Sequence, residues 1–180
     1  AENKRISQDI LVEPGFDGGA KPGQVVMVEL VAQPAKNSEP VARVIEVLGN
    51  YADPGMEIEI ALRKHDLPHV WPHDVEVLEK KVPKKVSAGD MKGREDLRDY
   101  PFVTIDGETA RDFDDAVAVR REEEGRIRLW VAIADVSHYV KVGDTIDQEA
   151  LQRGTSVYFP DRALPMLPEH LSNGICSLQA

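Results

Sequence analysis

Hydrophobic and polar residues alternate along several short stretches of the chain, a pattern typical of strands with one buried face. In the first half the alternation is strongest over residues 23–31 and 41–48, both rich in valine, and a shorter stretch covers 10–12. Glycine and proline pairs follow or separate these stretches and predict turns. The first half of the chain is therefore predicted to consist of short strands joined by tight turns.

Three valine-rich strands joined by such turns predict a small barrel of the OB-fold or cold-shock type, with the beginning of the barrel missing. Barrels of this kind bind single-stranded nucleic acid by stacking bases on aromatic side chains. The first 70 positions contain only two aromatic residues, Phe16 and Tyr51. We therefore expect this segment to serve mainly as a packing module.

The apolar spacing changes from strand-like to helical after Pro54-Gly55, and residues 56–67 predict a helix. A second short helix is expected at 74–82, after which apolar residues become sparse and the basic sequence KKVPKK begins. This shift in composition divides the chain. The expected parts are a partial cold-shock domain with connecting helices over 1–82, a linker over 83–100 and a second domain over 101–180.

Alternation returns in the second domain and predicts an antiparallel meander with an acidic loop at its mouth. Gly143-Asp144 and Thr145 can cap a helix that ends at Gly154. The expected elements are strands at 102–106, 115–121, 127–140 and 155–159, and helices at 146–153 and 169–175. The whole chain is thus predicted to be mixed α+β and rich in strands.

The composition, with 42% hydrophobic and 30% charged residues in 180 positions, is that of a soluble globular protein. No apolar run approaches the roughly 20 residues needed to cross a bilayer, and no secretory signal is visible. The single cysteine, Cys176, excludes an intrachain disulfide framework and fits a reducing cytosol. We expect a cytoplasmic protein without a membrane partner, in which Cys176 is a small buried residue.

The net charge of −10 is unusual for a protein that binds nucleic acid, because such proteins usually present basic surface. The charge is unevenly distributed, however. Residues 101–150 carry twelve acidic and six basic side chains, so this segment accounts for −6 of the −10. The acidic character therefore belongs mainly to the second domain, where it raises the question of what compensates it.

The densest charge lies in residues 104–117, TIDGETARDFDDAV, which include Asp106, Asp112, Asp114 and Asp115. Aspartates this close repel one another, and a hard divalent cation with oxygen ligands would compensate their charge. A solvated acidic loop is the alternative. Apolar residues interleaved with the acids favour the metal site, because they are typical of strand ends that hold carboxylates in place.

Two other kinds of metal site fit the sequence poorly. An EF-hand needs an acid or amide at the fifth position of its loop and glycine at the sixth, where Ala116 and Val117 stand. A zinc site is suggested by histidines at every fourth position, namely His65, His69 and His73. Pro68 and Pro72 interrupt that helix and no cysteine lies nearby, so surface or packing histidines are the favoured interpretation.

Four motifs resemble the start of the RNB catalytic domain of the ribonuclease II/R family. They are TIDGETARDFDDAV, IADVSHYV, RGTSVYFPDR and LPMLPEHLSNGICSL, which cover most of residues 102–178 in the order expected of that family. Upstream, PVARVIEVLGN and GMEIEIALRKHDLPHVWP resemble the second cold-shock domain and connecting segment of the ribonuclease R branch. The resemblance implies a partial cold-shock (OB-fold) domain followed by the N-terminal part of an RNB domain.

The resemblance implies a processive 3′→5′ exoribonuclease that hydrolyses single-stranded RNA to 5′-nucleoside monophosphates. Mg²⁺ is the implied cofactor, no small-molecule cofactor is implied, and the protein is expected to be monomeric. The family's catalytic, metal-binding aspartates match Asp106, Asp112, Asp114 and Asp115, although Asp115 could instead orient the 3′-terminal ribose or a water. Tyr158 matches the tyrosine that clamps the 3′-terminal nucleotide of the RNA.

The chain also departs from the family's whole pattern. The downstream part of the RNB domain, with the arginine and glutamate expected at the transition state, is missing, as are the first cold-shock domain, the S1 domain and the basic tail. We therefore expect this chain to be inactive by itself and to bind RNA weakly. The alternative is a non-catalytic RNA-binding protein on the same scaffold, against which the retained aspartates argue. A serine hydrolase built on Ser156 and His138 is excluded, because no nucleophile elbow surrounds Ser156.

Overall fold

The computed structural model describes residues 8–35 and 38–178, and the chain divides into two compact units between Leu67 and Pro68. Each unit has its own buried residues. In the first they include Ala42 and Leu62, and in the second they include Ile146 and Leu171, all at most 2% exposed. The two units therefore have separate hydrophobic centres.

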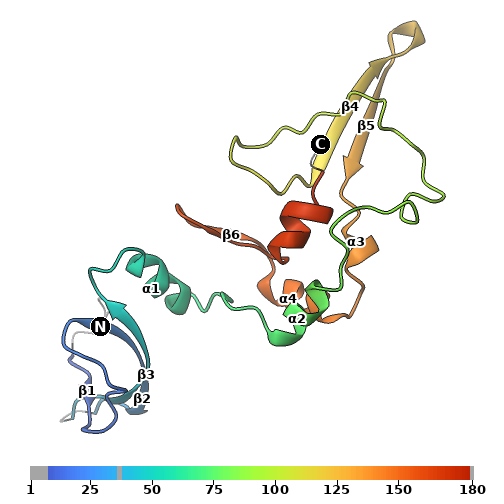
Figure 1. Cartoon of the computed structure of the whole chain (residues 1–180). Coiled ribbons are helices and arrows are strands. Elements are labelled where there is room, and N and C mark those ends of the chain that lie inside the picture. Colours follow the sequence, from blue (N-terminus) through green and yellow to red (C-terminus); the bar gives the residue numbers. More distant parts are fainter. Residues whose placement is uncertain (1–7, 36–37, 179–180) are drawn as a thin grey trace. The chain divides into compact units, whose positions relative to one another are not determined.

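The first unit is built on a three-stranded sheet with the strand order β1-β3-β2 (Figure 1). β1 (Leu11–Val12) pairs in parallel with β3 (Val41–Asn50), and β2 (Gln24–Ala32) pairs antiparallel with β3. Three register shifts interrupt the β2–β3 ladder. Such bulges bend a strand and increase its twist, as a sheet that curls into a barrel requires. The strands predicted at 10–12, 23–31 and 41–48 are confirmed as β1, β2 and β3.

A helix, α1 (Met56–Lys64), follows the sheet and confirms the predicted change from strand to helix. Leu62 on this helix is only 2% exposed. Arg63 pairs with Glu46 of β3, with 2.6 Å between Nη2 and Oε1, and with Glu59 one turn earlier on the helix. The side chain of Arg63 is 14% exposed, so this ion pair is partly shielded from solvent and ties the helix to the sheet.

Two helices and a π-helical turn surround the core of the second unit. They are α2 (His73–Glu79), α4 (Thr145–Arg153) and η2 (Leu171–Ile175). The start of α4 follows the predicted capping, because Asp144 accepts a hydrogen bond from the Asp147 N–H at 2.8 Å. The core consists of Val75, Val140, Ile146, Leu167, Leu171 and Cys176.

Arg153, which forms a buried ion pair within α4, also contacts the chain just before α2. Arg153 donates to Glu149 at 2.8 Å and to the carbonyl of Val70 at 3.3 Å, and its guanidinium lies 3.4 Å from the centre of the Trp71 ring. The Arg153 and Glu149 side chains are 4% and 9% exposed. Removing one partner of a buried pair leaves an uncompensated charge, which is strongly destabilising. Residues 68–82 therefore pack with the second unit. The prediction from composition had assigned them to the first domain, with a linker at 83–100.

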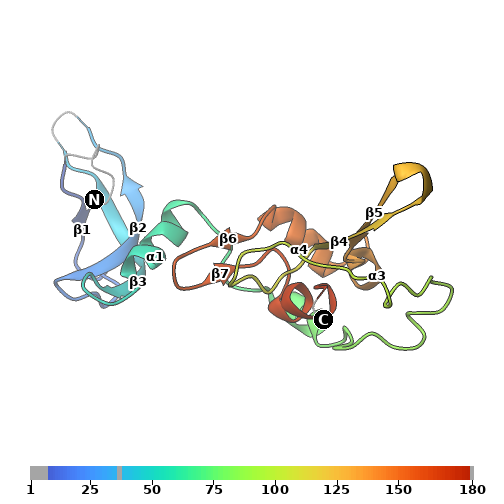
Figure 2. The same ribbon diagram turned by 90° about the horizontal axis from the view of Figure 1, so that it is seen from above.

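The predicted meander reduces to a two-stranded hairpin. β4 (Asp115–Arg121) and β5 (Ile127–Ile133) pair antiparallel across the turn η1 (Glu123–Gly125), and both views show this hairpin projecting from the helices (Figures 1 and 2). The strand predicted at 102–106 was wrong in extent, since only Val103 pairs, in an isolated bridge with Val117. In β5 the apolar residues Leu129, Val131 and Ile133 share one face, and each is more than half exposed, whereas Trp130 and Ala132 on the other face are partly buried.

The strand predicted over 127–140 was too long. The β4–β5 ladder ends where the Ala134 N–H donates to the Asp114 carbonyl at 2.9 Å, and α3 (Val136–Tyr139) then begins. Asp135 accepts from the Ser137 hydroxyl at 3.1 Å. A local side-chain bond of this type competes with strand pairing and favours a turn. Alternating residue types alone could not reveal this competition.

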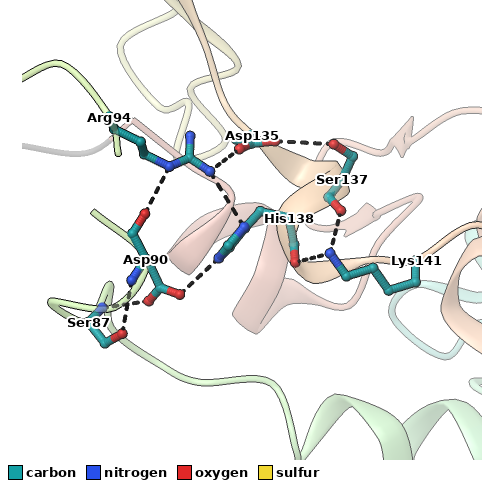
Figure 3. A network of polar contacts seen from close by, with 7 residues as sticks. All are labelled: Ser87, Asp90, Arg94, Asp135, Ser137, His138 and Lys141. Atoms are coloured by element: carbon teal, nitrogen blue, oxygen red, sulfur yellow. Dashed lines mark hydrogen bonds and ion pairs between the residues drawn. The ribbon is translucent and has the colours of Figure 1, made fainter. Parts of the chain in front are cut away.

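The segment predicted as a linker, 83–100, contains no helix or strand but is fixed to α3 by polar contacts (Figure 3). Asp90 Oδ1 lies 2.8 Å from His138 Nε2, and Asp90 also accepts the Ser87 N–H at 2.7 Å. Arg94 donates to Asp135 at 2.5 Å and to the Asp90 carbonyl at 2.9 Å. This segment therefore has a fixed position against α3 although it forms no helix or strand.

The remaining short strands, β6 (Val157–Tyr158) and β7 (Ala163–Leu164), form a second antiparallel hairpin. The mixed α+β fold class, rich in strands, is confirmed. Within residues 8–35 and 38–178, no helix is both long and apolar enough to cross a membrane.

Candidate acidic active site

The acidic loop is held at both of its ends by backbone pairing. Val103 and Val117 exchange two hydrogen bonds of 2.9 Å, one in each direction, and these close the loop that contains Asp106 and Asp112. Asp114 is fixed through its carbonyl by the Ala134 N–H, and Asp115 is the first residue of β4, opposite Ile133. The aspartates thus lie on a loop closed by the foot of the hairpin, as alternation with apolar residues predicted.

A residue far along the chain fixes the loop in its middle. The Ser177 hydroxyl accepts a hydrogen bond from the Phe113 N–H at 2.9 Å and donates to the Arg111 carbonyl at 2.9 Å. The next residue, Leu178, donates its N–H to the Phe113 carbonyl at 2.9 Å. Sequence reasoning did not single out Ser177, and the only signal for it was its place inside the last motif.

Tyr158, predicted to contact the RNA end, lies against the acidic loop. Its hydroxyl donates to Asp112 Oδ2 at 2.7 Å, and this bond, followed by partial burial, raises the pKa of Tyr158. The side chain is nevertheless 67% exposed, which leaves the ring available for a stacking partner. The structure therefore brings together two predicted site residues that are 46 positions apart.

The four aspartates also interact through their charge. Partial burial raises the pKa of Asp114, and the negative charges of Asp112, Asp115 and Asp106 raise it further, in that order. Like charges act on a carboxyl in this way only over short distances, because water and salt screen them. The mutual repulsion of the aspartates, predicted from the sequence, is thus present in the folded loop.

The donor set fits a hard divalent cation, since carboxylate oxygens are the ligands that Mg²⁺ and Ca²⁺ prefer. The geometry is not preassembled. Across the described ranges 8–35 and 38–178, no three histidine, cysteine, aspartate or glutamate side chains form a ready-made metal cage. Mg²⁺ binds proteins through one or two carboxylates and keeps several waters, so an open arrangement is compatible with it.

The positions of the helices also argue against a zinc site at His65, His69 and His73. α1 ends at Lys64, before the first of the three histidines, and His73 begins α2. The histidines therefore do not share one helix, and within the described part of the chain they form no metal cage.

The two other candidate nucleophiles, Ser156 and Cys176, are not available for catalysis. Ser156 Oγ accepts the Met166 N–H at 3.0 Å, while His138 pairs with Asp90. Cys176 is 3% exposed, and burial raises the pKa of its thiol to about 11. A thiol with so high a pKa stays protonated and unreactive near neutral pH. The acidic loop is accordingly the strongest candidate for chemistry.

An apolar cavity of about 920 Å³ adjoins the loop without being part of the acidic site. Phe113, Ala116 and Leu178 line it together with residues of the 91–104 segment, but none of the four aspartates does. The loop therefore presents apolar side chains to the cavity and its acidic groups elsewhere.

Comparison with protein-family models finds two domains in this chain. Residues 94–180 match the RNB domain, and residues 1–72 match the cold shock domain. All four loop aspartates, Tyr158 and Ser177 fall within the first of these matches. The fold and the family models thus agree on a cold-shock segment followed by an RNB segment.

Named relatives and solved structures give the same result. The chain is 51% identical to ribonuclease R of Escherichia coli over 181 residues and 48% identical to that of Thermotoga maritima over 179, with 98% of this chain covered each time. It covers only 22% and 25% of those relatives, so it spans about a quarter of their length or less.

Among solved structures, Mycoplasma genitalium RNase R in complex with double-stranded RNA matches with a TM-score of 0.87 and 32% identity. That match covers 97% of this chain and 31% of the other. Yeast Ssd1, a pseudonuclease, matches with a TM-score of 0.59 and 20% identity, over 84% of this chain and 19% of the other. The second likeness shows a shared fold and no more.

Proposed function

Because the chain belongs to the ribonuclease R family over the segment that it spans, we propose that it provides the catalytic aspartates of a processive 3′→5′ exoribonuclease. The substrate is the 3′ end of single-stranded RNA, and the products are 5′-nucleoside monophosphates. The observation that carries the proposal is the 2.7 Å hydrogen bond between Tyr158 and Asp112, which puts an exposed aromatic ring beside the acidic loop. Such a ring can bind any base, which suits an enzyme that degrades RNA of every sequence.

In this proposal Asp106, Asp112 and Asp114 hold Mg²⁺ directly or through water, and Asp115 either joins them or orients the terminal ribose or a water. The chemistry that a bound Mg²⁺ would supply there is activation of a water, neutralisation of the phosphoryl oxygens and stabilisation of the leaving 3′-oxygen. Tyr158 stacks on the last base and so sets which phosphodiester bond faces the aspartates. The like charge that raises the pKa of Asp114 supports a cation at this place.

The proposal also covers where the protein acts in the cell and whether the isolated 180-residue chain is active. We place the protein in the cytoplasm as a monomer with RNA as its partner. The 180-residue chain by itself is expected to be inactive, because no arginine and glutamate of the kind that the family uses at the transition state were found in its motifs. Degradation of a labelled single strand by the purified chain would contradict this expectation.

The function is tested in a chimera in which this chain replaces the matching segment of Escherichia coli ribonuclease R. We expect the chimera to degrade labelled RNA from its 3′ end, and Asp114→Asn to lower turnover at least about 100-fold, since a single preorganised electrostatic group is commonly worth 10²–10³ in rate. RNA binding, measured in EDTA, should persist in the variant. Glu123→Gln, the same chemical change on the exposed hairpin turn, is the matched control and should leave turnover unchanged.

The non-catalytic alternative has a different outcome in the same experiment. A chimera that binds RNA but shows no turnover with any divalent cation would favour it and overturn the exoribonuclease proposal. Equal turnover with Asp114 and with asparagine at that position would instead remove the acidic loop from the mechanism.

A further inference from the structure

Asp112 is flanked by two backbone groups that bond to one side chain. The Phe113 N–H donates to the Ser177 hydroxyl and that hydroxyl donates to the Arg111 carbonyl, both at 2.9 Å. We propose that Ser177 is the positioning residue of Asp112. By fixing the backbone on both sides, it holds the Asp112 carboxylate ready for a divalent cation. The role in metal binding rests on the proposed function, whereas the fixing of the backbone does not.

The chemistry of the hydroxyl suits this task. A serine Oγ is donor and acceptor at once, so a single atom can satisfy a backbone N–H and a backbone carbonyl that lie two residues apart. The partners are 64 and 66 positions away in sequence, so the contact ties the loop to the end of the π-helical turn rather than to its own neighbours. Leu178 extends the tie through its N–H to the Phe113 carbonyl.

A tie at this place has an electrostatic reason. Asp112 and Asp114 are carboxylates only two positions apart in the loop, and like charges this close repel one another and favour spreading the carboxylates apart. Ser177 restrains Asp112 through the backbone, and Tyr158 restrains it through the carboxylate at 2.7 Å. Among contacts of the described residues, Asp112 is thus the one loop aspartate with support at both its backbone and its side chain.

Support of this kind has a known effect in metal sites. Residues that orient a ligand without touching the metal typically change metal affinity 10–100-fold when substituted. Ser177 is therefore expected to act on metal affinity and on the mobility of the loop. It is not expected to contact RNA or the reacting atoms.

The first test measures hydrogen exchange of the Phe113 amide by NMR in the 180-residue chain, without metal. We expect Ser177→Ala to exchange this amide about tenfold faster, because the partly buried hydrogen bond from the Phe113 N–H to the Ser177 hydroxyl is lost. Ser177→Thr, which keeps the hydroxyl, should restore slow exchange. Ser172→Ala is the matched control, since that hydroxyl bonds to its sequence neighbour Asn173 at 3.3 Å and not to the acidic loop in the described part of the chain. If Ser177→Ala fails to fold, Ser177→Cys, with a weak S–H donor, carries the same comparison.

The second test measures Mn²⁺ affinity of the same proteins by electron paramagnetic resonance. We expect Ser177→Ala and Asp112→Asn each to bind Mn²⁺ at least about tenfold more weakly than wild type, with Ser177→Thr and Ser172→Ala close to wild type.

The outcomes separate the two ideas. Unchanged Phe113 exchange in Ser177→Ala overturns the positioning role whatever the metal does. Weaker Mn²⁺ binding in Asp112→Asn but not in Ser177→Ala also overturns it. Equal Mn²⁺ binding, or none, in wild type and Asp112→Asn contradicts the proposed metal site, while faster Phe113 exchange would still support the fixing of the backbone.

Discussion

Tyr158 has two chemical features, a hydroxyl and an aromatic ring, and the structure gives them different surroundings. The hydroxyl is engaged by Asp112 at 2.7 Å, and the ring belongs to a side chain that is 67% exposed. The sequence placed this tyrosine on a strand near the site only through its family motif. Its bond to Asp112 links the part of the site that would hold the base to the part that would hold the cation.

The two features can be separated by substitution in the chimera. Tyr158→Phe keeps the ring, so RNA binding in EDTA should stay near wild type. Tyr158→Ala should weaken binding by about 1–3 kcal/mol, the usual contribution of a stacked base. The measurement is fluorescence anisotropy with a labelled single strand. Tyr51→Ala is the control, because Tyr51 is a similarly exposed tyrosine, at 74%, in the first unit. A larger loss from Tyr51→Ala than from Tyr158→Ala would show that the cold-shock segment holds the base.

At the scale of elements, the contacts between the 87–94 segment and α3 replace secondary structure as the source of order (Figure 3). Asp90 is the centre of these contacts. Its hydrogen bond to His138, together with bonds from Ser87, lowers the pKa of Asp90 from 3.8 to about 2. Arg94, followed by Ser137, lowers the pKa of Asp135 in the same way. The segment is therefore held by ionised carboxylates.

These pKa shifts predict how stability depends on pH. A carboxyl whose pKa is lower in the folded state stabilises the fold above its unfolded pKa and loses that contribution as the pH falls through the folded pKa. For Asp90 the loss should occur between about pH 4 and about pH 2. Asp90→Asn should therefore lower the urea midpoint at pH 7 and reduce its fall towards pH 2.

The matched control is Asp96→Asn. The pKa of Asp96 is also lowered to about 2, mainly by its hydrogen bond to Arg98, but that partner is only two residues away. Losing the bond between Asp96 and Arg98 should release only one local turn, so Asp96→Asn should change the urea midpoint less than Asp90→Asn does. Equal effects of the two substitutions at pH 7 would show that the bond between Asp90 and His138 does not hold the segment to α3.

At the scale of the whole molecule, the chain divides earlier than its composition suggests. Composition changes after residue 82, yet Val75 is 1% exposed in the core of the second unit and Trp71 lies under Arg153. The second unit therefore requires the residues between Pro68 and the basic sequence. Hydrophobic contact, and not a change in composition, decides where the unit begins.

Two truncations test this division. A chain of residues 68–180 should fold cooperatively, whereas residues 83–180 should show lower helix content and a clearly lower Tm by circular dichroism. The shorter chain loses the buried Val75 and leaves the Arg153 and Glu149 pair uncovered, each worth about 1 kcal/mol or more. Identical thermal transitions for the two chains would place the boundary after residue 82.

Much of the architecture was readable from the sequence, because its cause is local. Valine-rich alternation predicted β2 and β3, and Asp144 with Gly154 predicted both ends of α4. Alternation failed where a side chain bonds to nearby groups. Asp135 and Ser137 lie in an alternating stretch that resembles a strand, but their hydrogen bond belongs to a helical turn.

The candidate site, too, has a part that local sequence determines and a part that only the tertiary structure decides. The sequence by itself determined the acidic loop and its surplus of negative charge, because the four aspartates are close in the chain and their repulsion follows from spacing alone. Only the tertiary structure decided that Tyr158 and Ser177 hold Asp112, because these contacts cross 46 to 66 positions. Which distant residues meet depends on how the helices and hairpins pack, and the packing of elements is not written in the spacing of any one motif.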